Sequence, residues 1–340
     1  MFQMRVFVSE VLSAEITENK QIDILEDSIY ELDARLLNVL LEDKTKSTHT
    51  IKKNIVWACD EYAKYGEAYT AEKEILPELI TGNNTKIIQP RTAKNKEDQL
   101  NRTRKLAEVF TPSWICNEMN NHCDEEWFGR KNVFNTPDGH DWIPNPESIV
   151  FPENGNSKSA SWMKYVDSKR LEITCGEAPY LVSRYDTTSG EFLPIEKRIG
   201  ILDRKLRVVG ENTENEKDWF NWARRAFEAT YGYEYQGDNL LLARENLLWT
   251  FIEYYQKQFG KEPSLAQKKQ IANIIAWNIW QMDGLTDTVP FSQVEQIVPQ
   301  ADFFTPETKI YTPMLCEIQD WRSKKKILFQ EMKGNKDEVS

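Results

Sequence analysis

The chain has 340 residues, of which 40% are hydrophobic and 11% aromatic, so it can bury a full core and is not a disordered chain. Its formal net charge of −11 excludes a protein that grips nucleic acid through its own overall charge. Five cysteines without regular spacing indicate free thiols in a reducing, cytoplasmic setting. The most apolar stretch, residues 240–255, is interrupted by Arg244 and Glu245, so we expect no membrane-spanning segment.

Residues 1–85 are expected to form an N-terminal extension of mixed, largely helical structure. Val6 and Val8 give a short strand-like pattern, and the apolar spacing over 25–41 is helical. A second helical pattern covers 54–80. Neither stretch holds a catalytic constellation, so we interpret the extension as a helical cap or an interaction surface.

Residues 86–122 combine a basic linker with the start of a helix. The linker holds seven basic residues against only two acidic ones, Glu97 and Asp98. This excess indicates a strip that follows phosphates or, as we favour, a solvated linker and helix face. Thr111-Pro112 predicts a helix start, because threonine can cap a helix and proline suits its first position. The basic residues are Lys86, Arg91, Lys94, Lys96, Arg102, Arg104 and Lys105.

Residues 123–165 are rich in Asn, Asp, Pro, Gly and Ser and are expected to form a long surface excursion. Cys116, His122 and Cys123 lie around its start. No second pair of ligands follows them, so zinc is not expected and we assign no metal ligand.

The stretch 171–182, LEITCGEAPYLV, is the centre of the predicted organisation. Leu171, Ile173 and Cys175 alternate with polar residues, which is the period of a strand, and Gly176 permits a sharp turn. Pro179 suits the first position of a helix, so the turn is expected to present backbone N–H groups and a helix N-terminus to a ligand. Such a turn is also common as plain structure, and alone it favours neither interpretation.

Two further strand ends follow within the same expected domain, 166–335. Helical spacing over 201–209 and around Trp219 leads to a strand at 231–238 and a helix at 239–255. Glu234 in that strand can accept ribose hydroxyls or be a surface glutamate. The stretch 271–280 leads to Asp283-Gly284, which can accept a hydrogen bond from an amine or be an ordinary turn. Residues 336–340 are expected to be a polar tail.

Together, these segments resemble the N-terminal, S-adenosylmethionine-binding half of an adenine-N6 DNA methyltransferase of the restriction–modification type. Val109-Phe110-Thr111-Pro112 resembles the family's leading cofactor motif, V-F-T-P, and 171–181 resembles its main cofactor loop. The segments 231–238 and 281–284 resemble the ribose-binding and adenine-contacting strands. The stretch 170–246 is similar to bacterial proteins described as restriction endonuclease or modification subunits. The resemblance covers roughly residues 50–335.

This resemblance implies an α/β fold with a Rossmann-like sheet of the class I S-adenosylmethionine-dependent methyltransferases, first strands only, preceded by the helical extension. Phe110 and Thr111 would line the methionine end of the cofactor, Glu234 would hold the ribose and Asp283 the adenine amine. Glu172 and Gly176 would lie under the methionine and sulfonium end. Ala178 stands where many relatives have a glycine, which predicts somewhat weaker binding. The implied cofactor-binding residues are Phe110, Thr111, Pro112, Glu172, Thr174, Cys175, Gly176, Tyr180, Glu234, Tyr235, Asp283 and Gly284.

The family's catalytic tetrapeptide, Asn/Asp-Pro-Pro-Tyr/Phe, is absent, and Asn145-Pro146 lies in the wrong place. We therefore assign no catalytic residue and expect that this chain alone does not methylate DNA. It would be one piece of a split enzyme whose partner chain carries the catalytic and DNA-recognition half, a truncated product, or a module that keeps the pocket without the reaction. DNA would be bound only by the complete assembly.

A second interpretation is a non-catalytic interaction or regulatory protein on a methyltransferase-like scaffold. A dinucleotide-dependent oxidoreductase is disfavoured, because the Gly-x-Gly-x-x-Gly fingerprint is absent. A nuclease is also disfavoured, since Asp186, Glu191 and Glu196-Lys197 form no convincing metal-dependent cleavage arrangement.

Overall fold

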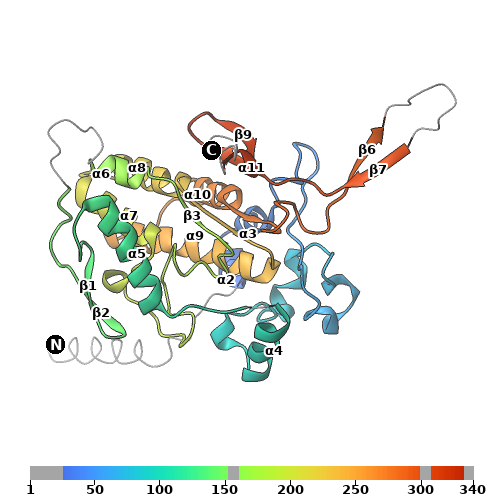
Figure 1. Cartoon of the computed structure of the whole chain (residues 1–340), viewed down its shortest axis with the longest axis horizontal. Coiled ribbons are helices and arrows are strands. Elements are labelled where there is room, and N and C mark those ends of the chain that lie inside the picture. The colour runs from blue at the N-terminus through green and yellow to red at the C-terminus, as the bar shows by residue number, and fades with distance from the viewer. Residues whose placement is uncertain (1–25, 107, 152–160, 299–307, 333–340) are drawn as a thin grey trace, which may run out of the picture.

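The computed structural model describes residues 26–106, 108–151, 161–298 and 308–332 (Figure 1). The expected α/β class is confirmed, since helices pack against a small parallel sheet. Its strands are β3 (Arg170–Glu172), β4 (Thr230–Glu234) and β5 (Ile279–Gln281), in the order β3-β4-β5. The strand-like pattern at Val6 and Val8 and the tail 336–340 lie outside the described residues.

Two helices join each pair of neighbouring strands in this sheet, because parallel strands need a long crossover. α7 (Ile201–Asn212) and α8 (Glu216–Glu228) connect β3 to β4. α9 (Gly237–Phe259) and α10 (Leu265–Asn278) connect β4 to β5. The helices expected at 201–209, around Trp219 and over 239–255 are confirmed.

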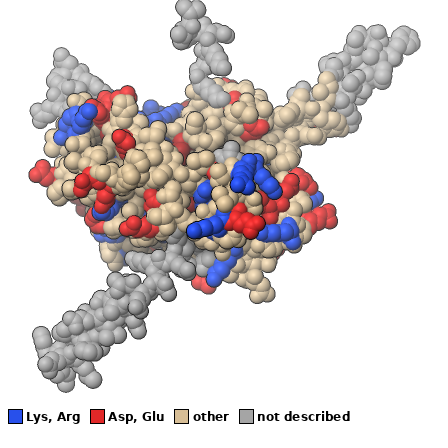
Figure 2. All heavy atoms as spheres, turned by 60° about the horizontal axis from the view of Figure 1, so that its bottom comes forward, with Lys and Arg blue, Asp and Glu red and all other residues tan. Residues whose placement is uncertain are grey.

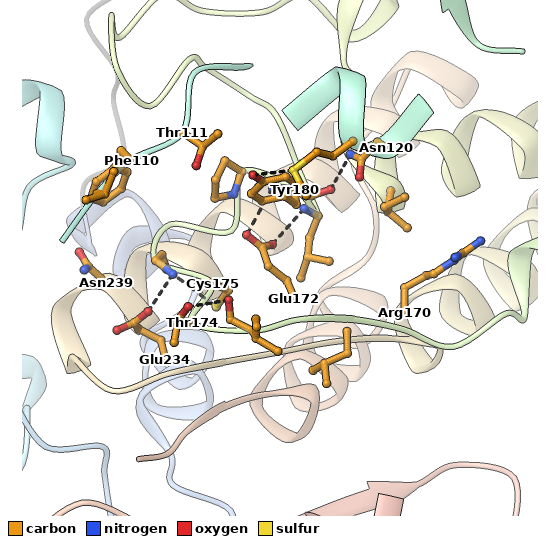
Figure 3. Close-up of a pocket in the computed structure, with 18 of the residues that line it drawn as sticks. Phe110, Thr111, Asn120, Arg170, Glu172, Thr174, Cys175, Tyr180, Glu234 and Asn239 are labelled. Carbon is orange, nitrogen blue, oxygen red and sulfur yellow. Dashed lines mark hydrogen bonds between the residues drawn. The ribbon is translucent and has the colours of Figure 1, made fainter. Parts of the chain in front are cut away.

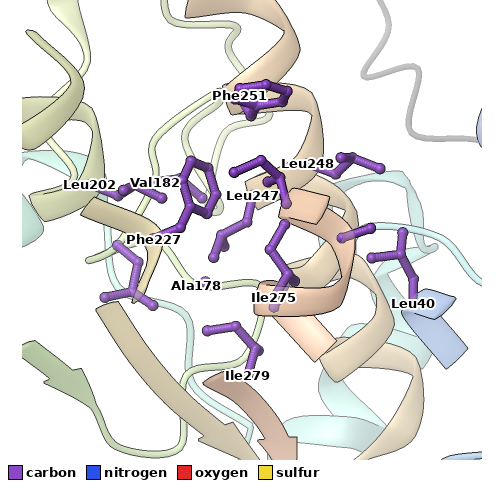
Figure 4. Packing of buried hydrophobic residues seen from close by; sticks show 14 of the residues in the cluster. Leu40, Ala178, Val182, Leu202, Phe227, Leu247, Leu248, Phe251, Ile275 and Ile279 are labelled. Atoms are coloured by element: carbon purple, nitrogen blue, oxygen red, sulfur yellow. The ribbon is translucent and has the colours of Figure 1, made fainter. Parts of the chain in front are cut away.

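The main hydrophobic core lies between these helices and one face of the sheet (Figure 4). Phe227 of α8, Phe251 of α9 and Ile275 of α10 belong to it. α9 has 17 buried residues among its 23, so its apolar side chains are not confined to one narrow stripe. A second cluster covers the opposite sheet face, where the Phe329 ring centroid lies 5.8 Å from that of Tyr233.

The N-terminal region packs against the same core. α2 (Glu26–Leu32) and α3 (Ala34–Leu41) confirm the helical pattern expected over 25–41. Leu40 of α3 is fully buried, and its carbonyl accepts a hydrogen bond from the buried guanidinium of Arg244 in α9. Gly237, at the start of α9, donates its N–H to the Trp57 carbonyl at 3.0 Å. A Cβ at Gly237 would overlap the carbonyl of Val56, so glycine is required for this close approach.

The helix expected over 54–80 is wrong. Isolated bridges join this stretch to its neighbours, and its helical pieces are single 3₁₀ turns. Gly66, with φ of +129°, ends the first turn, and Trp57 contacts Tyr62 and Tyr69 with ring centroids 4.7 and 5.4 Å apart. The apolar spacing therefore serves an aromatic cluster. The 3₁₀ turns in the described residues are η1 (Ala63–Tyr65), η2 (Glu67–Tyr69), η3 (Pro77–Leu79), η4 (Gly82–Asn84), η5 (Arg91–Ala93) and η6 (Ile195–Lys197).

The remaining elements lie before β3 and after β5. α5 (Ser113–Phe128) begins one residue after Pro112, so the expected helix start is confirmed to within one position. The excursion 123–165 contains buried Phe134 and Tyr165, so part of it belongs to the core. These elements are α4 (Lys96–Leu106), the hairpin β1 (Asn135–Asp138) and β2 (Asp141–Pro144), α6 (Trp162–Val166), the hairpins β6 (Val294–Val298) with β7 (Thr308–Thr312) and β8 (Glu317–Asp320) with β9 (Lys325–Leu328), and α11 (Phe329–Met332). Within the described ranges, no helix has the length and apolar character needed to cross a membrane.

Candidate functional site

A cavity of about 1410 Å³ lies where β3 and β4 end (Figure 3). Four stretches of chain from distant parts of the sequence line it, together with Ile201 at the start of α7. These are residues from 105–111 before α5, from 118–123 within α5, from 169–181 around β3 and the turn that follows it, and from 234–239 between β4 and α9. The carboxyl ends of parallel strands are where open α/β sheets bind ligands, so this cavity is the candidate site.

The turn after β3 is strained, and its residues belong to no helix or strand. Thr174, Gly176 and Ala178 have φ of +45°, +54° and +63°, in the left-handed region that costs a non-glycine residue about 1–2 kcal/mol. The helix expected to begin at Pro179 is wrong, because the chain continues as loop and α7 begins only at Ile201. The turn therefore offers the ligand a loop, without a helix N-terminus.

Glu234 fixes this turn against the end of β4. Its Oε2 accepts the N–H of Gly176 at 2.8 Å, and its Oε1 accepts the N–H groups of Tyr235 and Gln236 at 2.9 and 3.1 Å. Burial raises the pKa of Glu234, and the three N–H groups act in the opposite direction. The carboxylate thus shapes the cavity wall, and of its roughly four lone-pair positions one, on Oε2, is left beyond these three bonds.

A second carboxylate, Glu172, ends β3 on the wall of the same cavity. It accepts the N–H groups of Leu181 at 3.2 Å and Tyr180 at 3.5 Å, as Figure 3 shows. Burial raises the pKa of Glu172 well above its ordinary value, and the Glu234 carboxylate adds to that rise. Burial likewise raises the pKa of the Cys175 thiol, so this cysteine is not poised as a nucleophile.

Phe110 lies over the turn from the opposite side. A Cβ built at Gly176 would lie 3.8 Å from the Phe110 ring, and the Arg91 guanidinium lies 5.1 Å from the ring centroid. Behind this segment, Asp186 caps α5 by accepting the N–H of Ser113 at 2.7 Å. Burial opposes ionisation of Asp186, but hydrogen bonds led by that from Thr188 hold its pKa at about 2. Asp186 is therefore a helix cap, which accounts for its charge without a nuclease role.

Nine of the twelve residues assigned by the resemblance line this one cavity. Pro112, Asp283 and Gly284 do not. The Asp283 carboxylate accepts the N–H of Leu285 at 2.8 Å, so it closes its own turn after β5. The nine are Phe110, Thr111, Glu172, Thr174, Cys175, Gly176, Tyr180, Glu234 and Tyr235.

Asn239 and Glu108 line the cavity and were not assigned from the sequence. Asn239 donates to Glu108 Oε2 at 3.0 Å, and that oxygen also accepts from Arg102 at 2.6 Å. Arg102 is 1% exposed and forms a further ion pair with Asp238 at 2.9 Å. Asp238 and Asn239 are far in the chain from Arg102 and Glu108, so no spacing pattern reveals that the two pairs meet. Glu108 does directly precede the V-F-T-P motif, which is the one local signal.

The basic linker is not one solvated strip. Arg102 is buried, Lys94 pairs with Asp238 at 3.2 Å, and Arg91 lies 3.5 Å from Glu108. On the face shown in Figure 2, Lys and Arg side chains of the described residues lie among Asp and Glu. Part of the basic charge expected to be solvated is therefore paired with buried carboxylates beside the site.

Within the described ranges, no group of three or more His, Cys, Asp or Glu side chains is arranged to hold a metal ion. The cavity instead combines buried carboxylates, the amide of Asn239 and the rings of Phe110 and Tyr180. Such a set suits an organic ligand with hydroxyl or amine donors and a planar or apolar part. Comparisons of the chain with protein-family models, with curated proteins and with solved structures found no match.

Proposed function

We propose that this chain is the cofactor-binding portion of a site-specific adenine-N6 DNA methyltransferase of the restriction–modification type. The observation that carries the proposal is that three segments assigned from the sequence to cofactor motifs begin in neighbouring parallel strands and continue past their carboxyl ends, in chain order. Segments after two of those strands, together with Phe110 and Thr111, line one cavity. A Rossmann-like methyltransferase sheet is the fold that we propose on this basis.

In this proposal the cavity binds S-adenosylmethionine, which supplies an activated methyl group when bound. Glu234 holds the turn at Gly176 and offers its one remaining lone pair, on Oε2, to a ribose hydroxyl. Phe110 covers the turn and keeps water from it. We do not assign Asp283 to the adenine amine, because it does not line the cavity.

The chain alone would be inactive, because methyl transfer to adenine needs a polar acceptor for the amine and an aromatic platform for the extruded base. The sequence contains no Asn-Pro-Pro-Tyr type segment that would supply them. A partner chain would carry these groups and the DNA-binding surface, in line with the charge of −11 on this chain. Five free cysteines support a cytoplasmic location for the assembly.

The test is a radiolabelled methyl-transfer assay on mixed genomic DNA. We expect no incorporation with the 340-residue chain alone, and incorporation after a polypeptide carrying an Asn-Pro-Pro-Tyr strand is added. Incorporation by the chain alone would show that catalytic residues were overlooked. No incorporation in either arm, with the cofactor bound, would favour a non-catalytic protein on the same scaffold.

A further inference from the structure

β3 is an edge strand whose outer side has no partner strand among the described residues. Arg170 donates its N–H to the Ala229 carbonyl at 3.0 Å, toward β4. In a parallel ladder successive residues point their backbone groups to alternate sides, so the N–H and C=O of Leu171 point away from β4. The outer side of β3 therefore presents a donor and an acceptor to the cavity.

The apolar row of the sheet also ends uncovered at β3. Leu171 is paired in register with Tyr231, yet Leu171 is 40% exposed and Tyr231 is 1% exposed. Ile173 is 63% exposed. The cluster around Phe329 covers the sheet face at Tyr231 and does not extend to Leu171. Strands of parallel sheets are normally buried on both faces, so this uncovered end is unusual.

The cavity runs round this edge. Its lining includes Leu171 from one face of β3, Glu172 from the other, and Ile173 directly after the strand. Lys169 and Arg170 at the start of the strand line it as well, so the hollow runs along the free edge and not only past the end of β3. Met119 and Cys123 of α5 also line this hollow, and Met119 is 53% exposed. The edge therefore faces a slot that α5 bounds, which suits a single extended segment better than the edge of a second helix-covered sheet.

We propose that this slot receives an extended segment of a different polypeptide, which adds to β3 as a fourth strand. The inference rests on the proposed function, because that segment is where the missing acceptor and aromatic group would enter beside the cofactor cavity. Apolar residues at alternate positions of the segment would cover Leu171 and Ile173. The charge of −11 on this chain selects a partner that is basic overall.

Two proline variants test the geometry of the edge in the isolated chain. Leu171→Pro removes an N–H that points outward, so we expect the urea midpoint to stay close to that of the wild type. Arg170→Pro removes the bond to Ala229, so we expect a clearly lower midpoint. Equal loss of stability in both variants would overturn the assignment of the free edge.

A random library of twelve-residue peptides, selected on the immobilised full chain, tests strand addition itself. We expect enriched peptides with apolar residues at alternate positions, slower deuterium exchange at the Leu171 amide when they bind, and affinity for Leu171→Pro weaker by roughly tenfold or more. No enrichment, or equal affinity for Leu171→Pro, would overturn the inference. Calorimetry with S-adenosylmethionine on the same samples separates the two proposals. Cofactor binding without peptide binding refutes only the docking site, and the reverse refutes only the proposed function.

Discussion

Replacing Glu234 with glutamine should loosen the turn that forms the cavity wall. The carboxylate accepts three backbone N–H groups, through both of its oxygens. Glutamine has only one acceptor oxygen. If that oxygen accepts the N–H groups of Tyr235 and Gln236, the side-chain NH₂ group points at the N–H of Gly176, and two donors then face each other without an acceptor. A buried donor without a partner costs about 1–3 kcal/mol, which is the loss of unfolding free energy that we expect for Glu234→Gln. From the sequence alone, this residue was expected to matter for the ligand and not for the fold.

The assay is urea unfolding followed by circular dichroism, together with a calorimetric titration of S-adenosylmethionine. The control is Glu214→Gln, which changes an exposed glutamate between α7 and α8 and should shift the unfolding free energy by less than about 0.5 kcal/mol. We expect Glu234→Gln to lose both stability and cofactor affinity. Stability equal to that of the control variant would refute the role of Glu234 as the clamp on the turn.

Two further variants test other parts of the structure. Gly237→Ala should lower the unfolding free energy by about 1–3 kcal/mol or more, because the added Cβ would overlap the carbonyl of Val56. The control is Gly210→Ala, whose Cβ would come closest to the flexible end of a glutamine side chain, and it should be close to neutral in the same urea assay. The buried side-chain oxygens of Glu26 and Glu245 have no hydrogen-bond partner. Burial raises the pKa of both groups, that of Glu26 to about 8, and repulsion from Asp27 adds to the rise at Glu26 and repulsion from Glu26 to the rise at Glu245. Since a raised folded-state pKa gives stability that is full below the unfolded value near 4.5 and falls as pH rises, Glu245→Gln should exceed the wild type in stability at pH 8 and not at pH 4. Parallel pH profiles for the two proteins would contradict this.

The periodicity of apolar residues in the sequence made the centre of the fold predictable. Glu234 ends a strand of five buried residues, and the helix after it is long and apolar enough to leave no alternative. The turn at Gly176 was also found from the sequence, because a glycine follows an alternating strand pattern. These local signals brought most of the assigned residues to one cavity.

Contacts between distant segments could not be predicted. Ala178 was treated as a small obstacle to a ligand, and its residue type gave no sign of its φ of +63°. Its carbonyl accepts the N–H of Val182 and closes a single turn, which does not continue as a helix. The buried guanidinium of Arg102 joins Glu108 and Asp238, and no pattern within one segment distinguishes it from a solvated arginine. Asp283 does not line the cavity, and the sequence of its turn does not show whether the carboxylate bonds within the turn or toward a ligand.

The measurement that tests the central claim most directly is the calorimetric titration of the 340-residue chain with S-adenosylmethionine, with NAD as the competing dinucleotide. We expect saturable binding of S-adenosylmethionine or its demethylated product, with no competition from NAD and with weaker binding by Glu234→Gln. A folded chain that gives no heat and no thermal shift at millimolar cofactor would contradict the proposal that this cavity is a methyl-donor site.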